Sequence, residues 1–286
     1  MDFSRYLGAA MAEMAAIRAE IASLRARPVL YVGAGIDAIV SCDGFDLVVP
    51  TKEVGLLSYL VQHGFSAIEP AVRAAIRRNV KAGDRVIDAG ANIGLHSVVL
   101  AQQVRGSGEL LCFEPIPHLA AAVTRTLRLN GYGDRSQVIE SALAEAAGEV
   151  TLHVADHSPV SSFYKPDGVG SSDMVVKKTT VDDIVGPGGR LDFVKMDVEG
   201  AEPLVWQGMQ RTIMENANLA IVLEWSASHF ARSGFSASDF LRQITEAGFH
   251  AFLLRDDQPD VPSEVATDAA AVIEAGNLLL TRRAAP

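Results

Sequence analysis

From Arg85 onward, short apolar runs alternate with segments of helical periodicity. The apolar runs predict strands at Val86–Ala89, Glu109–Phe113, Gln137–Ser141, Phe193–Met196, Ala220–Glu224, Ala251–Leu254 and Leu278–Leu280. The periodic segments predict helices at Leu95–Val104, Leu119–Asn130, Pro203–Asn216 and Phe240–Ala247. This alternation is typical of an α/β fold with a mostly parallel sheet covered on both faces. The last two strands form a pair with no predicted helix between them, so we expect the sheet to end in antiparallel strands.

The first 80 residues have a different pattern. Apolar side chains at alternating steps of three and four predict an amphipathic helix between Arg5 and Arg27, with a seam of Leu7, Ala10, Met14, Ile17, Ile21 and Leu24. Three short strands, Val29–Val32, Ala38–Cys42 and Leu47–Val49, predict an antiparallel meander, and helical patterns follow at Glu53–His63 and Glu69–Val80. We therefore expect an N-terminal region at 1–80, for oligomerisation or as a cap over the substrate, and the main domain at 81–286.

Composition and charge narrow the class of protein. The chain has 286 residues, 49% of them hydrophobic, so it can bury a large core and is not a disordered chain. Its formal net charge of −10 disfavours nucleic acids and anionic membranes as partners. Neither a signal peptide nor an apolar stretch of the ~18 residues that span a bilayer is recognisable. The two cysteines, Cys42 and Cys112, suit a reducing compartment, so we expect a cytoplasmic location.

Two glycine-rich turns compete as the cofactor site. The first, Gly33-Ala-Gly35-Ile-Asp-Ala38, fits the spacing of a dinucleotide-binding fingerprint, which places a helix N-terminus at the pyrophosphate. The residues that follow it are β-branched and then turn at Asp43-Gly44, so no helix begins there. We therefore interpret the first turn as part of a β-hairpin.

The second turn lies between an apolar strand and a helical pattern. It reads Asp88-Ala-Gly90-Ala-Asn92-Ile-Gly94, and the next predicted strand ends in Glu114, twenty residues after Gly94. A carboxylate at about this spacing accepts hydrogen bonds from ribose hydroxyls. The combination indicates a cofactor that carries a nucleoside.

These residues resemble a known family. The segments 88–94 and 113–115, Phe-Glu-Pro, look like the first two cofactor motifs of class I S-adenosylmethionine-dependent methyltransferases. Within that superfamily, residues 194–202, Val-Lys-Met-Asp-Val-Glu-Gly-Ala-Glu, are similar to the hallmark of the FkbM family, and residues 161–163 and 179–184 also resemble its segments. The resemblance covers about residues 80–285. It implies a Rossmann-like fold, S-adenosylmethionine as cofactor and methyl transfer to an oxygen of a sugar, polyketide or related metabolite.

The resemblance also suggests where the cofactor binds. We expect the methionine part at Asp88 and at the backbone of Gly90, Asn92 and Gly94. Glu114 is expected to accept the ribose hydroxyls. Ser141 and Ala142, at the end of the third strand, are expected beside the adenine.

Two carboxylates follow the predicted strand Phe193–Met196. Because side chains alternate along a strand, Lys195, Asp197 and Glu199 are expected on the same side of the sheet as the strand ends. Open α/β sheets bind ligands at this end of their strands. We expect Asp197 to face the cationic donor and Glu199 to act as the general base, a role that contributes ~10²–10⁴-fold to a rate. Lys195 is expected to bind substrate, with the alternative that it only pairs with an acid.

Histidines are the natural rivals for the base, because their ordinary pKa is nearest neutrality. His96 opens the helix after the second glycine turn, and His229 follows the strand that ends in Glu224, itself a predicted substrate-binding residue. No metal site is predicted, because His153, Asp156 and His157 lack the helical spacing of a zinc pair. The segment Ala155–Ser172 is rich in Ser, Pro and Gly and is expected to form a lid over the acceptor.

The motifs are compatible with three functions. The leading one is an O-methyltransferase of small molecules or glycans. An NAD-dependent oxidoreductase of Rossmann type would need a glycine turn that cradles a pyrophosphate, and the alternating spacing of Gly90, Asn92 and Gly94 is wrong for that. A non-catalytic binding scaffold using the N-terminal helix is the third, and the intact donor motifs argue against it.

The seam of the N-terminal helix predicts a homodimer. Leu7, Met14 and Ile21 fall seven residues apart, yet fewer than three heptads make a marginal coiled coil, so the helix must pack on a partner copy or on its own domain. Light scattering should give a dimer mass for the full chain and a monomer mass for a chain starting near Arg27. A monomeric full-length protein at micromolar concentration would contradict the predicted dimer.

Overall fold

The computed structural model describes residues 30–32, 37–42, 44–155, 161–162, 171–265 and 273–282. The helix predicted between Arg5 and Arg27 lies outside the described residues, and the homodimer stays a prediction. Among the helices described in these ranges, none is both long and apolar enough to span a bilayer.

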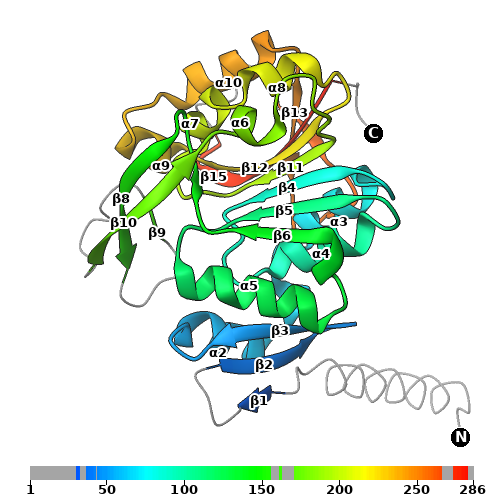
Figure 1. Cartoon of the computed structure of the whole chain (residues 1–286). Coiled ribbons are helices and arrows are strands. Elements are labelled where there is room, and N and C mark those ends of the chain that lie inside the picture. Colours follow the sequence, from blue (N-terminus) through cyan, green and yellow to red (C-terminus); the bar gives the residue numbers. More distant parts are fainter. Residues whose placement is uncertain are drawn as a thin grey trace, which may run out of the picture.

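The centre of the fold is an eight-stranded sheet with the order β14-β13-β15-β12-β11-β4-β5-β6 (Figure 1). Its parallel part consists of β4 (Arg85–Ala89), β5 (Glu109–Phe113), β6 (Ser136–Ile139), β11 (Phe193–Met196) and β12 (Ala220–Ser226). Its antiparallel end consists of β13 (His250–Leu254), β14 (Ser263–Glu264) and β15 (Ala275–Thr281). The predicted α/β fold with a mostly parallel, Rossmann-like sheet and antiparallel final strands is confirmed.

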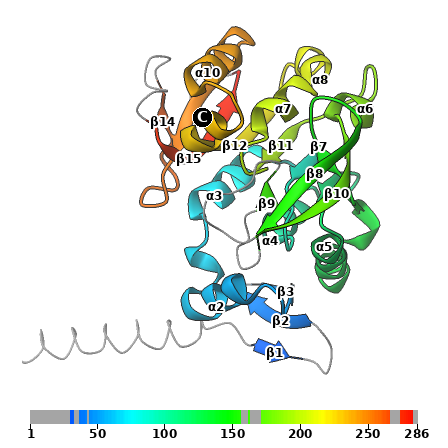
Figure 2. The same ribbon diagram turned by 90° about the vertical axis from the view of Figure 1, so that its left-hand side faces the viewer.

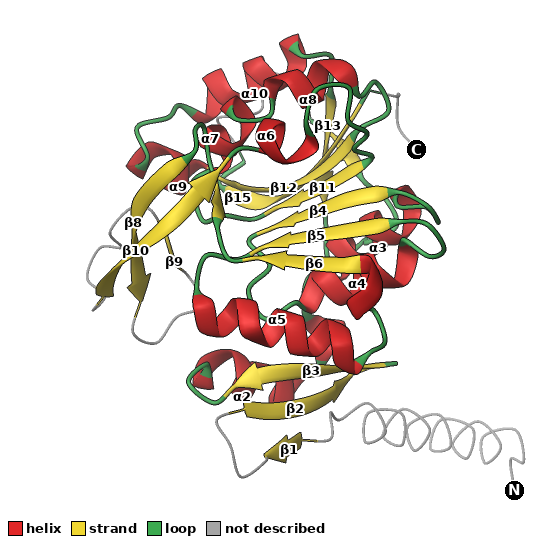
Figure 3. Cartoon of the chain, viewed as in Figure 1, coloured by secondary structure: helices red, strands yellow, loops and turns green. Residues whose placement is uncertain are grey.

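Helices cover both faces of this sheet, as the secondary-structure colouring shows (Figure 3). One face carries α3 (Pro70–Asn79), α4 (Leu95–Gln103) and α5 (Pro117–Leu129). The other carries α6 (Val181–Val185), α7 (Glu202–Gln207), α8 (Gln210–Glu215), α9 (Ala227–Arg232) and α10 (Ala237–Glu246). Successive strand residues alternate between the two cores: Val86 and Leu110 pack on the first face, and Ile87 and Leu111 on the second. Burial on both faces explains why these strands read as continuous apolar runs.

The single helix predicted at Pro203–Asn216 is wrong, because the chain forms two helices, α7 and α8, with a break at Gly208 and Met209. The Asp182 carboxylate accepts hydrogen bonds from the backbone N–H groups of Arg211 and Thr212, so it caps a new helix start. A side chain at Gly208 would collide with the Ala144 carbonyl oxygen. Tertiary contacts thus override a continuous helical pattern.

A second, four-stranded sheet has the order β7-β10-β8-β9. Its strands are β7 (Ala142–Leu143), β8 (Gly148–Ala155), β9 (Ser161–Ser162) and β10 (Ser171–Thr179). The apolar pattern of Glu149–Val154 also indicates a strand, and it lies within β8. The segment Ala155–Ser172, whose Ser, Pro and Gly content argues against regular structure, belongs at its two ends to β8 and β10, which pair in register. Most of that segment lies outside the described residues, and its role as a lid stays a prediction.

The N-terminal meander is confirmed as antiparallel strands β1 (Leu30–Val32), β2 (Asp37–Cys42) and β3 (Phe45–Pro50). Because β1 and β2 pair antiparallel on either side of the first glycine turn, no helix follows that turn. α2 (Val54–His63) and two short 3₁₀ turns, Phe65–Ala67 and Gly133–Arg135, complete the described elements. Turned by 90°, the molecule shows the meander and α2 at the end opposite to α10 (Figure 2).

The N-terminal region shares a core with the main domain. Val40 and Leu47 of the meander belong to the same apolar cluster as Val123 of α5 and Val86 of β4. The backbone N–H of Val48 in β3 donates to the Thr126 hydroxyl of α5 at 3.0 Å, and both residues are buried. The division into two regions at residue 80 stays a prediction. In the structure, side chains of the two regions pack into one continuous core.

Replacing Thr126 by Val is expected to lower the free energy of unfolding by about 1–3 kcal/mol, because it leaves the buried N–H of Val48 without an acceptor. Thr124→Val on the same helix is the matched control, since the Thr124 hydroxyl donates only to the carbonyl of Ala120 within α5. Urea unfolding of both variants measures the difference. Equal stability of the two variants would contradict this role of Thr126.

Candidate functional site

A cavity of about 260 Å³ opens at the carboxyl ends of β4, β5 and β11. The strand order reverses next to β4, since β5 continues the sheet on one side and β11 on the other. Open α/β sheets bind ligands at such a point, because the connecting loops leave in opposite directions there. Residues of the main domain and of the N-terminal region line the cavity, among them Gly90, Glu114, Asp197, Leu56 and Glu69.

The turn after β4 brings the backbone of two strands together. Gly90 has a φ of 77°, and a side chain there would collide with the Asp197 carbonyl oxygen. Asn92, with a φ of 52°, and Gly94, with a φ of 88°, also have left-handed backbone, and Gly94 precedes α4. The alternating pattern of the sequence motif therefore marks the positions where this turn needs positive φ.

A buried ammonium group links the two central strands. Lys195 on β11 lies opposite Asp88 on β4 in register, and the residue is 4% exposed. Lys195 Nζ lies 3.0 Å from Asp197 Oδ2 and 3.9 Å from Asp88 Oδ1, and it donates to the Gly90 carbonyl at 3.4 Å. The Lys195 side chain is thus occupied by acids of the protein, and its predicted contact with substrate stays a prediction.

Opposing effects set the charge of the two acids beside Lys195. Burial raises the pKa of Asp88, although Lys195 and the hydroxyl of Ser97, which donates at 2.6 Å, act against it. For Asp197, burial also raises the pKa, but the Lys195 ammonium and its hydrogen bond outweigh this and hold the pKa below its usual range. Asp197 is therefore a carboxylate that lines the cavity, while Asp88 lies behind it.

Glu114 follows β5 and lines the cavity on its other side. Its carboxylate accepts hydrogen bonds from the backbone N–H groups of Asn92, at 2.8 Å, and Ile116, at 2.9 Å. Burial raises the pKa of Glu114 to about 7, even though both hydrogen bonds oppose the shift. The sequence spacing therefore correctly pairs Glu114 with the glycine turn.

The turn after β11 holds Glu199 in an unusual conformation. Glu199 has a φ of 57°, and Gly200 has a φ of 99°. The Glu202 carboxylate is 1% exposed and accepts from the N–H groups of Val198 and Gly200. Non-glycine residues with positive φ persist only where the surroundings hold them, often at functional sites. This turn fixes Glu199 at the wall of the cavity.

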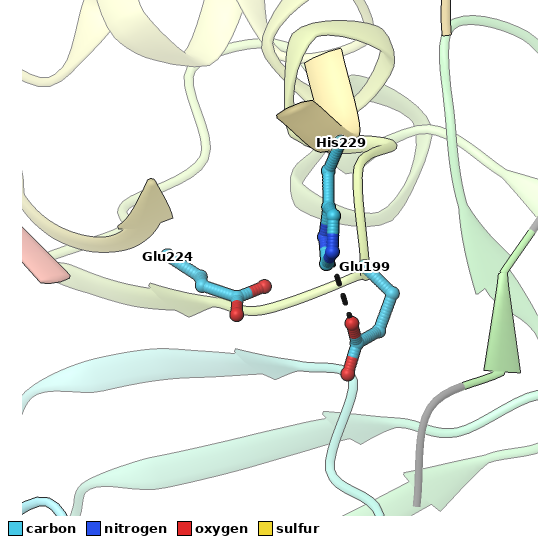
Figure 4. A group of neighbouring side chains, drawn as sticks. All are labelled: Glu199, Glu224 and His229. Carbon is cyan, nitrogen blue, oxygen red and sulfur yellow. Dashed lines mark ion pairs between the residues drawn. The ribbon is translucent and has the colours of Figure 1, made fainter. Parts of the chain in front are cut away.

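Glu199 meets Glu224 of β12 and His229 of α9, and the three side chains point toward one another (Figure 4). His229 Nδ1 lies 3.8 Å from Glu199 Oε2. Burial and the negative charge of Asp197 raise the pKa of Glu199 to about 8 and that of Glu224 to about 10. Burial lowers the pKa of His229. Glu224 and His229 are not among the described residues that line the cavity, and Glu199 connects them to it.

Glu69, which precedes α3 and lines the cavity, was not predicted as a site residue. It has a φ of 41°, and the α3 N-terminus is capped instead by Asp256, whose carboxylate accepts from the Ala71 N–H. The Glu69 carboxylate accepts from Asn277 at 2.8 Å and lies 3.5 Å from His96 Nε2. Burial lowers the pKa of His96 to about 3, so its imidazole is neutral and weakly basic.

The remaining predicted residues divide between the cavity and its surroundings. Ala142 lines the cavity, whereas the Ser141 hydroxyl donates to the carbonyls of Ala142 and Lys177. His153 pairs with Asp173 across β8 and β10, and Asp156 and His157 lie outside the described residues. The cavity thus joins most of the predicted cofactor residues with Asp197 and Glu199.

The charge of the lining suits a cationic ligand. Four acids line the cavity, Glu69, Glu114, Asp197 and Glu199, together with Lys195 and the neutral imidazole of His96. One end, at Glu114 and the glycine turn, offers a carboxylate and backbone groups. The other end has the acids Asp197 and Glu199, with Lys195 beside them. A ligand with a nucleoside at one end and a positive charge at the other would fit this arrangement.

Comparison with known proteins finds similarity to methyltransferases. Residues 88–251 match the model of the methyltransferase FkbM domain. The chain is 27% identical over 181 residues to "Methyltransferase sdnD" of Sordaria araneosa, which is 52% of this chain and 70% of that protein. It is 28% identical over 106 residues to a protein-L-isoaspartate O-methyltransferase of Methanococcus aeolicus, which is 36% of this chain and 45% of that protein.

Solved structures of methyltransferases are also similar. A SAM-dependent methyltransferase from Aquifex aeolicus aligns with a TM-score of 0.47 and 9% identity, over 79% of this chain and 96% of that one. A SAM-dependent O-methyltransferase from Thermotoga maritima aligns with a TM-score of 0.43 and 15% identity, over 84% of this chain and 75% of that one.

Proposed function

The chain belongs to the FkbM methyltransferase family, and we propose that it transfers a methyl group from S-adenosylmethionine to a hydroxyl oxygen of a small molecule or glycan. The observation that carries the proposal is the convergence of Asp197 and Glu199 at one end of the cavity whose other end holds Glu114. A hydroxyl acceptor must lose a proton, and a carboxylate close to the transferred methyl group can accept it.

The residues present fit the donor. Glu114 and the turn at Gly90 and Asn92 would hold the ribose and the methionine part, and Ala142 would lie at the base. The acidic end would face the positive sulfur, where Asp197 remains ionised beside Lys195. Glu69, at the same wall, adds a carboxylate for the donor's ammonium group.

When bound, the donor supplies a methyl group on a cationic sulfur. The acceptor oxygen forms a bond to the methyl carbon as the carbon–sulfur bond breaks, and the electron pair of that bond stays on sulfur. The protein's part is to align the two reactants, which supplies much of the rate, and to let the hydroxyl proton leave. We assign this second task to Glu199 and its neighbours rather than to His96. A neutral imidazole with a pKa near 3 is a poor proton acceptor.

An oxygen acceptor is favoured over a nucleic-acid base by charge. The chain carries −10 overall, and the cavity lining is acidic. A nucleic-acid backbone would be repelled by both. The O-methyltransferase named among the relatives is consistent with oxygen chemistry.

Binding of S-adenosylhomocysteine, the demethylated donor, is expected to weaken about tenfold between pH 8 and pH 6, since Glu114 has a pKa of about 7. The ribose hydroxyls need the carboxylate as acceptor, so protonation below pH 7 removes the site. Calorimetry at several pH values measures the effect. Glu114→Gln should weaken binding at pH 8 by about 1–3 kcal/mol and flatten the pH dependence.

Glu109→Gln is the matched control for this experiment. Glu109 is the first residue of β5, the strand that Glu114 follows, and it forms a surface ion pair with Arg85 at 2.7 Å. It should keep both the affinity and its pH dependence. If affinity depended on pH in Glu114→Gln as it does in the unchanged chain, the ribose contact would have to be made by another residue.

Glu199→Gln is expected to keep donor affinity and to lose most turnover, by ~10²–10⁴-fold, because the amide keeps the size of the side chain but not its charge. Transfer of labelled methyl to a panel of hydroxylated metabolites measures turnover, and calorimetry measures donor binding. Glu145→Gln, on the exposed turn between β7 and β8, serves as the control. Near-normal turnover in Glu199→Gln would remove Glu199 from the reaction.

A further inference from the structure

Glu199, Glu224 and His229 come from three separate elements and present one ligand atom each within 4.8 Å of one another (Figure 4). Two carboxylates and an imidazole are typical metal ligands. Ligands bound to one divalent ion at about 2.0–2.6 Å lie at most about 5 Å apart. The separation of 3.8 Å between His229 Nδ1 and Glu199 Oε2 falls inside that limit. We call these three side chains the Glu-Glu-His cluster.

Two atoms of the cluster need a partner. Glu224 Oε2 and His229 Nδ1 are buried and have no hydrogen bond among the described residues. Leaving a buried polar atom unsatisfied is unfavourable, so such atoms in a native protein call for an explanation. A metal ion would satisfy both at once.

Two of the charged groups near the cluster, Glu202 and Lys195, make their contacts elsewhere. The Glu202 carboxylate accepts from the backbone of Val198 and Gly200, and the Lys195 ammonium contacts Asp88 and Asp197. Both groups are therefore excluded as members of the site.

The backbone around the cluster is fixed in place. A side chain at Gly200 would lie 3.1 Å from His229 Cβ, so the turn after β11 packs directly on α9. The Ser233 hydroxyl donates to the carbonyls of Gly200 and His229, both at 2.8 Å. Metal ligands must be held by such supporting contacts to bind with a defined geometry.

We propose that Glu199, Glu224 and His229 form a binding site for one divalent metal ion at the edge of the cavity. The mixed oxygen and nitrogen ligands suit Mn²⁺ or Zn²⁺ better than Ca²⁺, which takes oxygen ligands. Three protein ligands leave coordination positions open for an oxygen from outside the protein.

The role of the ion rests on the proposed function. Because Glu199 lines the cavity, an acceptor hydroxyl can occupy an open position on the ion. A bound cation lowers the pKa of an oxygen ligand, so the hydroxyl releases its proton to water before its oxygen bonds to the methyl carbon. Glu199 then acts as a metal ligand, and the ion activates the acceptor.

Titration of Mn²⁺ into the full chain, without donor or acceptor, tests the site. Electron paramagnetic resonance of free Mn²⁺ should give one bound ion per chain, displaced by Zn²⁺. Glu224→Gln and His229→Ala should each weaken Mn²⁺ binding at least about tenfold. Circular dichroism checks that the variants fold, and Glu224→Asp, which keeps the charge but shortens the reach, gives a second variant if Glu224→Gln does not.

Glu264→Gln is the matched control, because Glu264 pairs with His250 at 3.0 Å on the surface and is remote from the cluster in sequence. It should bind Mn²⁺ as the unchanged chain does. Absence of Mn²⁺ binding at millimolar concentration, or equal binding by folded Glu224→Gln, would overturn the site and favour a shared proton in the cluster.

Chelation separates this proposal from the proposed function. Loss of methyl transfer in EDTA, restored by Mn²⁺, supports both. Methyl transfer that continues in EDTA, with no Mn²⁺ bound, overturns the metal site and leaves the proposed function standing. Mn²⁺ bound with no transfer to any hydroxyl overturns the oxygen acceptor and leaves the site standing.

Discussion

The Lys195 ammonium fixes the geometry on which both ends of the cavity depend. It is buried between β4 and β11 and contacts Asp88, Asp197 and the Gly90 carbonyl. Without it, two carboxylates would face each other in the core, and removing one partner of a buried ion pair costs about 3–5 kcal/mol. The same contact ties the glycine turn to the acidic turn after β11. The spacing of the two ends of the cavity is therefore set by a charge inside the sheet rather than by the loops alone.

A close approach of backbone reinforces this link. The absence of a side chain at Gly90 lets the Asp197 carbonyl lie against the turn. The β11 turn in turn packs on α9 at Gly200. These two contacts thus connect the turn after β4, the turn after β11 and the helix that carries His229. A change in any one of them is transmitted to Glu199, whose left-handed backbone leaves little room to adjust.

The sequence was informative where local pattern decides structure. Apolar runs located the central strands to within one or two residues, because burial on both faces leaves little freedom of composition. The glycine and acid spacing also located Gly90 and Glu114 correctly at one cavity. It failed where a distant segment decides. The helix break at Gly208 depends on Asp182 and Ala144, and β10 depends on pairing with β8.

The same limit applies to the site. Glu69 lines the cavity, and Asp256, from a distant part of the chain, accepts from the first turn of α3 in its place. Glu224 and His229 were found as separate candidates, but their meeting with Glu199 depends on how α9 packs on the turn after β11. Spacing along a chain carries no information about such contacts, which are made through the tertiary fold.

The surplus of acids is the feature that links stability to function. Burial raises the pKa of Glu114, Glu199, Glu202 and Glu224 alike, so each of them lowers the stability of the fold as the pH rises from the ordinary pKa of a glutamate toward the raised value. A protein selected for stability alone would replace such acids by apolar residues of similar size. Their persistence around one cavity is explained if positive charge arrives from outside, at the sulfur of the donor and at the Glu-Glu-His cluster. Binding of either cation then stabilises the fold and prepares the reaction by the same electrostatic interaction.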